Sequence, residues 1–188
     1  FMGTPEFAVP TLKAIQKSEH KILEVYTQPA KKKDRGQKIK NSPIHDCAEY
    51  YNLKVRCPVS LEANDELDHF IKLKPDLVIV VAYGKILPNK LLDLVKIPFI
   101  NVHASILPKW RGAAPIQRSI MNMDNETGVS IMKIIPKLDA GPILMQSKIK
   151  INRETTFTDL SNEMSKLGAK LIIDTLECIE NNNVNFTD

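Results

Sequence analysis

The stretch Leu77-Val78-Ile79-Val80-Val81-Ala82-Tyr83 decides the fold, because it is apolar throughout and rich in β-branched residues. Such a run is typical of a central strand that is buried on both faces of a parallel sheet. The next apolar run, Pro98-Phe99-Ile100-Asn101-Val102-His103, predicts a second strand that ends in polar residues. We expect both strands to deliver the loops that follow them to the same edge of the sheet, where ligands bind in open α/β sheets.

Strand and helix patterns alternate on either side of these two runs. Strands are expected at residues 22–27, 55–57, 129–135 and 143–151, and helices at 43–51, 64–73 and 115–123. The connection between the last two strands is short, so we expect them to extend the sheet as an antiparallel pair. A final helix follows Thr156, which resembles a capping box with Asp159, and its apolar stripe comprises Leu160, Met164, Leu167 and Leu171. The pattern predicts an α/β fold: a doubly wound, Rossmann-like, mostly parallel sheet with helices on both faces.

The composition limits the class of protein. With 188 residues, 43% of them hydrophobic and 26% charged, the chain has the makeup of a soluble globular protein with one domain, or with one domain and a small appendage. We expect neither a membrane span nor a signal peptide, because no apolar run has the required length or flanks. The three cysteines form no Cys-x-x-Cys pair, which favours a reducing cytoplasm over a disulfide framework or a zinc site. His20, His45 and His69 show no metal spacing and are expected at the surface, so we expect no metal.

The positive charge is concentrated in one segment. Residues 31–40 carry six basic residues and one acidic residue, a net charge of +5, whereas the whole chain carries +4. The remainder is therefore close to neutral, at −1. A positive loop on a neutral body indicates a polyanion partner. A merely solvated surface loop is the alternative that the charge alone leaves open.

Asn101, His103 and Asp139 are the candidate catalytic residues. Residues i and i+2 of a strand point to the same face, so Asn101 and His103 present an amide and an imidazole side by side. Asp139 lies in Leu138-Asp139-Ala140-Gly141-Pro142, a tight turn that could bring a carboxylate to the imidazole. Together these groups can stabilise a tetrahedral oxyanion and move a proton, which indicates acyl transfer.

The residues that follow His103 resemble a known family. Ala104-Ser105-Ile106-Leu107-Pro108 precedes Trp110-Arg111-Gly112-Ala113-Ala114-Pro115-Ile116-Gln117, an order similar to the catalytic core of the folate-dependent formyltransferases. The Trp-Arg-Gly string and the segments 3–10, 27–29, 81–84 and 127–132 are similar to the members that act on methionyl-tRNA. Ala104 departs from the pattern, since relatives often have glycine there, and its methyl group could narrow the approach to the folate.

The resemblance implies transfer of a formyl group from 10-formyltetrahydrofolate to the α-amine of initiator methionyl-tRNA, for translation initiation. It implies that Asn101 and a protonated His103 stabilise the oxyanion, with Asp139 holding His103 charged, and that neither a metal nor a covalent acyl-enzyme is needed. The walls and backbone groups that hold the pterin would come from Ile86, Leu87, Ser105, Ile106, Leu107 and Pro108. Two alternatives remain: a folate formyltransferase acting on glycinamide ribonucleotide or an amino sugar nucleotide, and a non-catalytic RNA-binding module.

The resemblance also places a tRNA-inserting loop at residues 31–40. It singles out Arg35, and the remaining basic residues, which are expected to contact phosphates, are Lys31, Lys32, Lys33, Lys38 and Lys40. We expect a catalytic domain over residues 1–188 with a linker starting at 180–188. The start of the first strand and a second, smaller β-barrel domain are expected to lie outside this sequence. A monomer in the bacterial cytoplasm or an organellar matrix is expected.

Two further motifs have simpler interpretations. Gly3-Thr4-Pro5-Glu6-Phe7 lacks the glycines of a dinucleotide site and predicts a strand-to-helix turn. Trp110, the sole tryptophan, is expected to be a packing anchor, and Arg111 is left without an assigned role.

Overall fold

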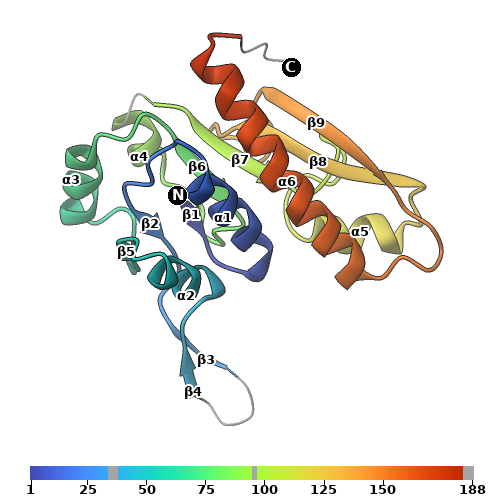
Figure 1. Ribbon diagram of the computed structural model, residues 1–188, viewed down its shortest axis with the longest axis horizontal. Coiled ribbons are helices and arrows are strands. Elements are labelled where there is room, and N and C mark those ends of the chain that lie inside the picture. The colour runs from blue at the N-terminus through green and yellow to red at the C-terminus, as the bar shows by residue number, and fades with distance from the viewer. Residues whose placement is uncertain (34–37, 95–96, 184–188) are drawn as a thin grey trace.

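The computed structural model describes residues 1–33, 38–94 and 97–183. Its main element is a seven-stranded sheet in the order β5-β2-β1-β6-β7-β8-β9 (Figure 1). The strands are β1 (Met2–Gly3), β2 (Val25–Tyr26), β5 (Val55–Arg56), β6 (Val78–Val81), β7 (Phe99–His103), β8 (Glu126–Lys133) and β9 (Ile143–Lys150). The first five strands of that order are parallel, and β8 and β9 add an antiparallel extension, as the sequence predicts.

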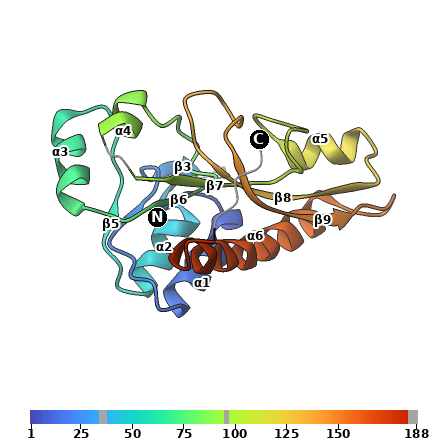
Figure 2. The same cartoon turned by 90° about the horizontal axis from the view of Figure 1, so that it is seen from above.

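Helices cover both faces of the sheet, which confirms the doubly wound arrangement (Figure 2). One face carries α1 (Val9–Lys17), α2 (Pro43–Tyr50) and α6 (Phe157–Glu180), and the other carries α3 (Asn64–Leu73) and α4 (Asn89–Leu94). The helix α5 (Pro115–Met121) contacts both β8 and α6. A short 3-10 turn, η1 (Glu6–Ala8), leads from β1 into α1, as predicted for this strand-to-helix turn.

The two faces of the sheet are separated by the alternation of side chains along each strand. All four residues of β6 are buried, with Ile79 and Val81 in the core cluster beneath α1 and α6 and Val78 and Val80 in the cluster beneath α3. On α6, a Cβ added to Gly168 would lie 2.8 Å from a methyl carbon of Val102, so this helix needs glycine to lie so close to β7. The predicted stripe of α6 is confirmed: Leu160, Met164 and Leu171 are buried, and Leu167 packs against the same core.

Several predicted boundaries are wrong, for local reasons. The strand expected at 22–27 forms ladder pairs only at Val25–Tyr26, since its neighbours β1 and β5 are equally short. The strand β6 ends at Val81 because Ala82 has a positive φ of 46°. The strand expected from residue 129 starts at Glu126, which pairs with Lys150 of β9. The histidines expected at the surface are partly buried, and each lies 2.8 to 3.2 Å from a carboxylate oxygen: His20 from Glu180, His45 from Glu49 and His69 from Glu24.

A separate two-stranded hairpin, β3 (Lys31–Lys33) and β4 (Lys38–Lys40), projects from the body of the molecule (Figure 1). At its base the buried hydroxyls of Thr27 and Ser42 lie 2.6 Å apart. Ser42 also accepts a hydrogen bond from the backbone N–H of His45 and caps α2. The two ends of the hairpin therefore leave the body at a fixed point.

Among the described residues, no helix has the length and apolar character needed to cross a membrane.

Candidate active site

The end of β7 supplies two of the expected catalytic side chains. Val102 packs against α6, so the alternation of the strand directs Asn101 and His103 to the opposite face of the sheet. His103 is 6% exposed, whereas Asn101 is half-buried. This position is at the carboxyl end of a parallel strand, as expected for a ligand-binding edge.

The structure brings Asp139 to His103, as the sequence predicts. The distance from His103 Nδ1 to Asp139 Oδ2 is 3.6 Å, and both side chains are largely buried. This distance fits an ion pair but is too long for a direct hydrogen bond. The second ring nitrogen, Nε2, lies 3.0 Å from the backbone oxygen of Trp110. A carbonyl oxygen only accepts, so His103 Nε2 donates in this contact.

The turn that carries Asp139 is fixed to the loop after β7. The carboxylate oxygen that faces His103 also accepts a hydrogen bond of 2.8 Å from the backbone N–H of Gly112. Asp139 and Gly112 both adopt positive φ angles, 42° and 85°. Asparagine, aspartate and glycine tolerate this conformation best. The Arg111-Gly112 segment therefore positions the carboxylate rather than acting as a simple turn.

Trp110, which the sequence predicts to be a packing anchor, also forms a hydrogen bond to a carboxylate. Its indole Nε1 donates to Asp124 Oδ2 at 2.7 Å, and the same carboxylate accepts from Lys109 Nζ and Asn122 Nδ2, each at 2.7 Å. Burial alone would raise the pKa of Asp124, but these hydrogen bonds outweigh burial and hold the pKa below its ordinary value. Asp124 thereby fixes Trp110, whose carbonyl in turn holds His103.

Two polar residues of the antiparallel strands fix the loop that contains Ser105 to Pro108. Ser130 of β8 lies opposite His103 in the ladder, and Gln146 of β9 lies opposite Ser130. Ser130 Oγ donates to the Ser105 carbonyl at 2.6 Å and accepts from the Leu107 N–H at 3.0 Å. Gln146 Nε2 donates to Ser130 Oγ at 2.8 Å and to the Leu107 carbonyl at 3.1 Å. The backbone of Leu107 thus has partners within the protein, and its N–H is not free to bind a pterin.

The residues expected to line the donor site differ in their exposure. Ser105, Leu107 and Leu87 are buried, so they pack within the protein. Ile86 is 89% exposed, an unusual state for a large apolar side chain, and Pro108 is also exposed. Ile106 is half-buried, and its methyl group would lie 2.6 Å from a Cβ added to Gly128. The assignment of all six residues to the donor site remains a prediction.

The described basic residues of the segment 31–40 lie on the β3–β4 hairpin, while Arg35 lies outside the described residues. Lys31 pairs with Lys40 in the ladder, and Lys33 pairs with Lys38. The register thus places lysines on both strands of the hairpin, which concentrates positive charge in this segment.

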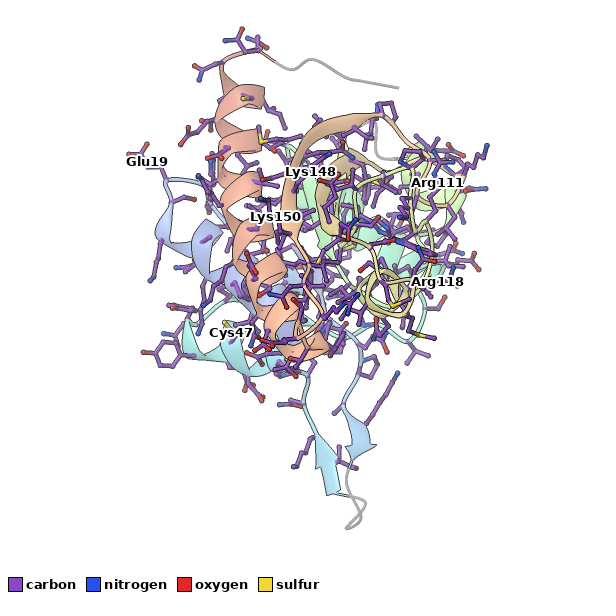
Figure 3. All side chains as sticks on the ribbon, turned by 90° about the vertical axis from the view of Figure 1, so that its right-hand side faces the viewer. Glu19, Cys47, Arg111, Arg118, Lys148 and Lys150 are labelled. Carbon is purple, nitrogen blue, oxygen red and sulfur yellow. The ribbon has the colours of Figure 1, made fainter. Side chains whose placement is uncertain are left out.

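Further basic residues lie on another face of the molecule. Figure 3 shows Arg111, Arg118 of α5, and Lys148 and Lys150 of β9 on the side turned toward the viewer. All four are exposed, although Lys148 forms an ion pair of 2.5 Å with Glu126. Arg111 is thus exposed to solvent, next in the chain to Trp110, whose carbonyl accepts from His103.

Sequence reasoning missed Ser130, Gln146, Asp124 and the carbonyl of Trp110. Ser130 left a signal, because it is a polar residue within the otherwise apolar run Val129–Met132 of a buried strand. The remaining three have no such signal, since their roles depend on which strands and loops meet. Within the described part of the chain, no group of three or more His, Cys, Asp or Glu side chains could hold a metal ion.

Known proteins are similar to this chain in sequence. The profile of the formyl transferase family, given as "Formyl transferase", matches residues 1–176. A methionyl-tRNA formyltransferase of Pelagibacter ubique is 52% identical over 189 residues, which cover 100% of this chain and 61% of that protein. One of Coxiella burnetii is 45% identical over 184 residues, covering 98% of this chain and 59% of that protein. The chain thus spans about three fifths of the length of these relatives.

Solved structures share the fold at low sequence identity. A phosphoribosylglycinamide formyltransferase of Anaplasma phagocytophilum superposes with a TM-score of 0.81 at 20% identity, over 100% of this chain and 92% of that one. A sugar 3N-formyl transferase, solved in the presence of dTDP and 5-N-formyl-THF, gives a TM-score of 0.72 at 22% identity, over 100% of this chain and 64% of that one. The profile match covers most of the chain, including β7 with Asn101 and His103 and the turn with Asp139, and so the chain belongs to the formyl transferase family.

Proposed function

We propose that the protein transfers a formyl group from 10-formyltetrahydrofolate to the α-amine of initiator methionyl-tRNA. The observation that carries this proposal is the juxtaposition of His103 with Asp139, 3.6 Å apart, beside Asn101 at the carboxyl end of β7. Membership of the formyl transferase family supports the reaction class. The names of the two relatives at 52% and 45% identity support the acceptor.

The proposed chemistry is an attack of the methionyl α-amine on the formyl carbon. The carbonyl oxygen becomes anionic in the tetrahedral intermediate, and the Asn101 amide and a protonated His103 donate hydrogen bonds to it. Each donor of this kind typically contributes ~10²–10³ in kcat within a site from which water is excluded. The intermediate then expels N10 of tetrahydrofolate, which takes a proton as the amine loses one.

Asp139 is proposed to hold His103 in its charged form and to relay the amine proton through a water. The separation of 3.6 Å between Asp139 Oδ2 and His103 Nδ1 lies within the range of an ion pair, which supports the first of these roles. Because His103 Nε2 donates to the Trp110 carbonyl, the ring must exchange a partner to reach an oxyanion. Catalytic hydrogen bonds of this type commonly tighten only when substrate is bound.

The β3–β4 hairpin is proposed to bind the tRNA, with Arg35 as its specific contact. The net charge of +5 over residues 31–40 and the projection of the hairpin from the body support this role. An arginine can stack on a base and donate two hydrogen bonds to one phosphate, which a lysine cannot. The lysines would supply contacts to phosphates that do not depend on sequence.

Two alternatives differ in acceptor or in kind. The phosphoribosylglycinamide and sugar formyltransferases share the fold, so the fold alone does not favour methionyl-tRNA over their acceptors. The basic hairpin and the higher identity to methionyl-tRNA formyltransferases favour the tRNA. A non-catalytic RNA-binding module would have no need of Asn101, His103 and Asp139 together.

The test is a transfer assay with donor radiolabelled in its formyl group. The purified protein is given methionyl-tRNA, glycinamide ribonucleotide or an amino sugar nucleotide as acceptor. Label on methionyl-tRNA alone would support the proposal. Label on either small acceptor would identify the first alternative, and tRNA binding without transfer would identify the second. We further propose that the protein acts as a monomer in the cytoplasm or an organellar matrix and needs no metal.

A further inference from the structure

Gln28 lies between the hairpin and the turn after β6. Its Nε2 donates a hydrogen bond of 3.0 Å to the carbonyl of Tyr83, and its Oε1 accepts from Nζ of Lys31, the first residue of β3. An ammonium group only donates and a carbonyl oxygen only accepts, so these two partners fix the orientation of the Gln28 amide. One side chain therefore contacts both the hairpin and the Tyr83-Gly84 turn.

Both residues of the Tyr83-Gly84 turn lie next to the Gln28 amide. Thr4 Oγ1 donates a second hydrogen bond of 2.7 Å to the same Tyr83 carbonyl, which uses both of its lone pairs. Gly84 has a φ of 78°, and a Cβ added there would lie 2.3 Å from Gln28 Nε2. The positive φ favours glycine at this position, and the Gln28 amide lies directly against the turn. The turn continues directly into Ile86 and Leu87, which are predicted to line the donor site.

The contact between Gln28 and Lys31 lies close to the fixed base of the hairpin. Gln28 is the first residue beyond Thr27, whose buried hydroxyl lies 2.6 Å from that of Ser42 and fixes the base of the hairpin. Beyond this base β3 and β4 form a two-stranded sheet of their own that extends away from the body (Figure 1). The Lys31 ammonium has three donors, so it can hold Gln28 and a phosphate at the same time.

We propose that Gln28 is a positioning residue that couples acceptor binding at the hairpin to donor binding beside the Tyr83-Gly84 turn. Acceptor binding fixes the hairpin, Lys31 and Gln28, and thereby fixes the turn. The donor then loses less conformational freedom on binding, so the coupling is positive. By linkage, the donor strengthens acceptor binding by the same factor. This inference rests on the proposed function, since it requires both ligands.

The experiment measures the dissociation constant of 5-formyltetrahydrofolate by calorimetry, with and without saturating methionyl-tRNA. For the wild type, methionyl-tRNA is expected to lower this constant ~5-fold or more. Gln28→Met keeps the length of the side chain but forms neither hydrogen bond. It is expected to bring the ratio of the two constants to about 1, while each ligand alone binds within ~3-fold of the wild type.

Two further variants sharpen the test. Thr4→Val removes the other hydrogen bond to the Tyr83 carbonyl and the acceptor of the Gln28 backbone N–H, but it leaves the contact between the Gln28 amide and Lys31 in place. It should change the binding of folate alone about as much as Gln28→Met does, within ~3-fold, and keep the wild-type ratio. Gln28→Glu keeps an acceptor for Lys31 but cannot donate to Tyr83, and it should lose the ratio, as Gln28→Met does. A ratio that survives in folded Gln28→Met and Gln28→Glu, or a wild-type ratio of 1 with both ligands bound, overturns the coupling alone. A wild type that fails to bind folate or methionyl-tRNA overturns the proposed function as well.

Discussion

The backbone carbonyl of Trp110 accepts a hydrogen bond of 3.0 Å from Nε2 of His103, seven residues earlier in the chain. The loop after β7 therefore turns back on the strand that it leaves. Its position is fixed at one end by Asp124, which binds the indole of Trp110, and at the other by Ser130, which binds the backbone of Ser105 and Leu107. His103 is thus held by the main chain of its own loop as well as by its proximity to Asp139.

The first prediction concerns the catalytic group itself. His103→Ala should lower kcat by ~10²-fold or more, because it removes a donor to the oxyanion and the group that moves the proton. Asp139→Asn should be similarly damaging, although its side-chain oxygen can still accept from the Gly112 N–H. Single-turnover transfer kinetics measure both effects, with thermal unfolding to confirm that each variant folds. Near-normal turnover in either folded variant would remove these residues from the mechanism.

Sequence could predict the strands and the three candidate catalytic residues, for identifiable reasons. The strands β6 and β7 could be predicted because each lies in a continuous apolar run, which indicates a buried strand even without alternation of polar and apolar residues. Asn101 and His103 share a face because successive side chains of a strand point to opposite faces of the sheet. The approach of Asp139 depended on a turn whose direction no pattern specifies. Gln146 meets Leu107 only because a register shift between Ile131 and Met132 sets its pairing with Ser130. A backbone acceptor such as the Trp110 carbonyl has no sequence signature at all.

The second prediction concerns Asp124 and pH. Asp124→Asn should lower the free energy of unfolding by ~2 kcal/mol at neutral pH, since three hydrogen bonds to a charged, largely buried carboxylate are weakened. The pKa of this carboxyl is lowered in the folded protein, so its contribution is full above the unfolded value of ~3.9 and is lost as the pH falls through the folded value. The difference between wild type and variant should therefore shrink below pH ~4. Urea unfolding at several pH values measures this, and a difference that is constant from pH 7 to 3 would contradict it.

The third prediction concerns the loop that is expected to hold the donor. Ser130→Ala leaves the Leu107 N–H and the Ser105 carbonyl without their partner, at a cost of ~1–3 kcal/mol in stability. The loosened loop should also weaken folate binding, while the hairpin and tRNA binding should be unaffected. Ser147→Ala, one strand away and on the other face, is the matched control and should change neither. Equal folate affinity in wild type and Ser130→Ala would place the donor away from Ser105 to Pro108.

A related prediction probes the same donor loop by steric bulk. Leu107 is 5% exposed, so Leu107→Trp cannot be accommodated without moving the loop. Calorimetry with a folate analogue should show weaker binding, whereas methionyl-tRNA affinity should remain at the wild-type value. If both affinities fall together, the substitution has damaged the fold rather than the donor site, and thermal unfolding would show this as a lower Tm. If neither falls, the loop does not line the donor site.

The final prediction tests the hairpin as the tRNA-binding element. Arg35→Ala should weaken methionyl-tRNA binding, and Arg35→Lys should restore little, because lysine lacks the planar fork of arginine. Changing Lys31, Lys32 and Lys33 together to Ala should reduce the dependence of log affinity on log salt, by a slope of roughly 1 for each phosphate that the hairpin no longer neutralises. The exposed Lys13 and Lys17 of α1 provide a control, since changing both to Ala removes two positive charges from another element. Affinity is measured across a salt series. Hairpin variants that keep the wild-type affinity and slope would show that the lysines of the hairpin are only a solvated surface, and the tRNA assignment would then rest on family resemblance alone.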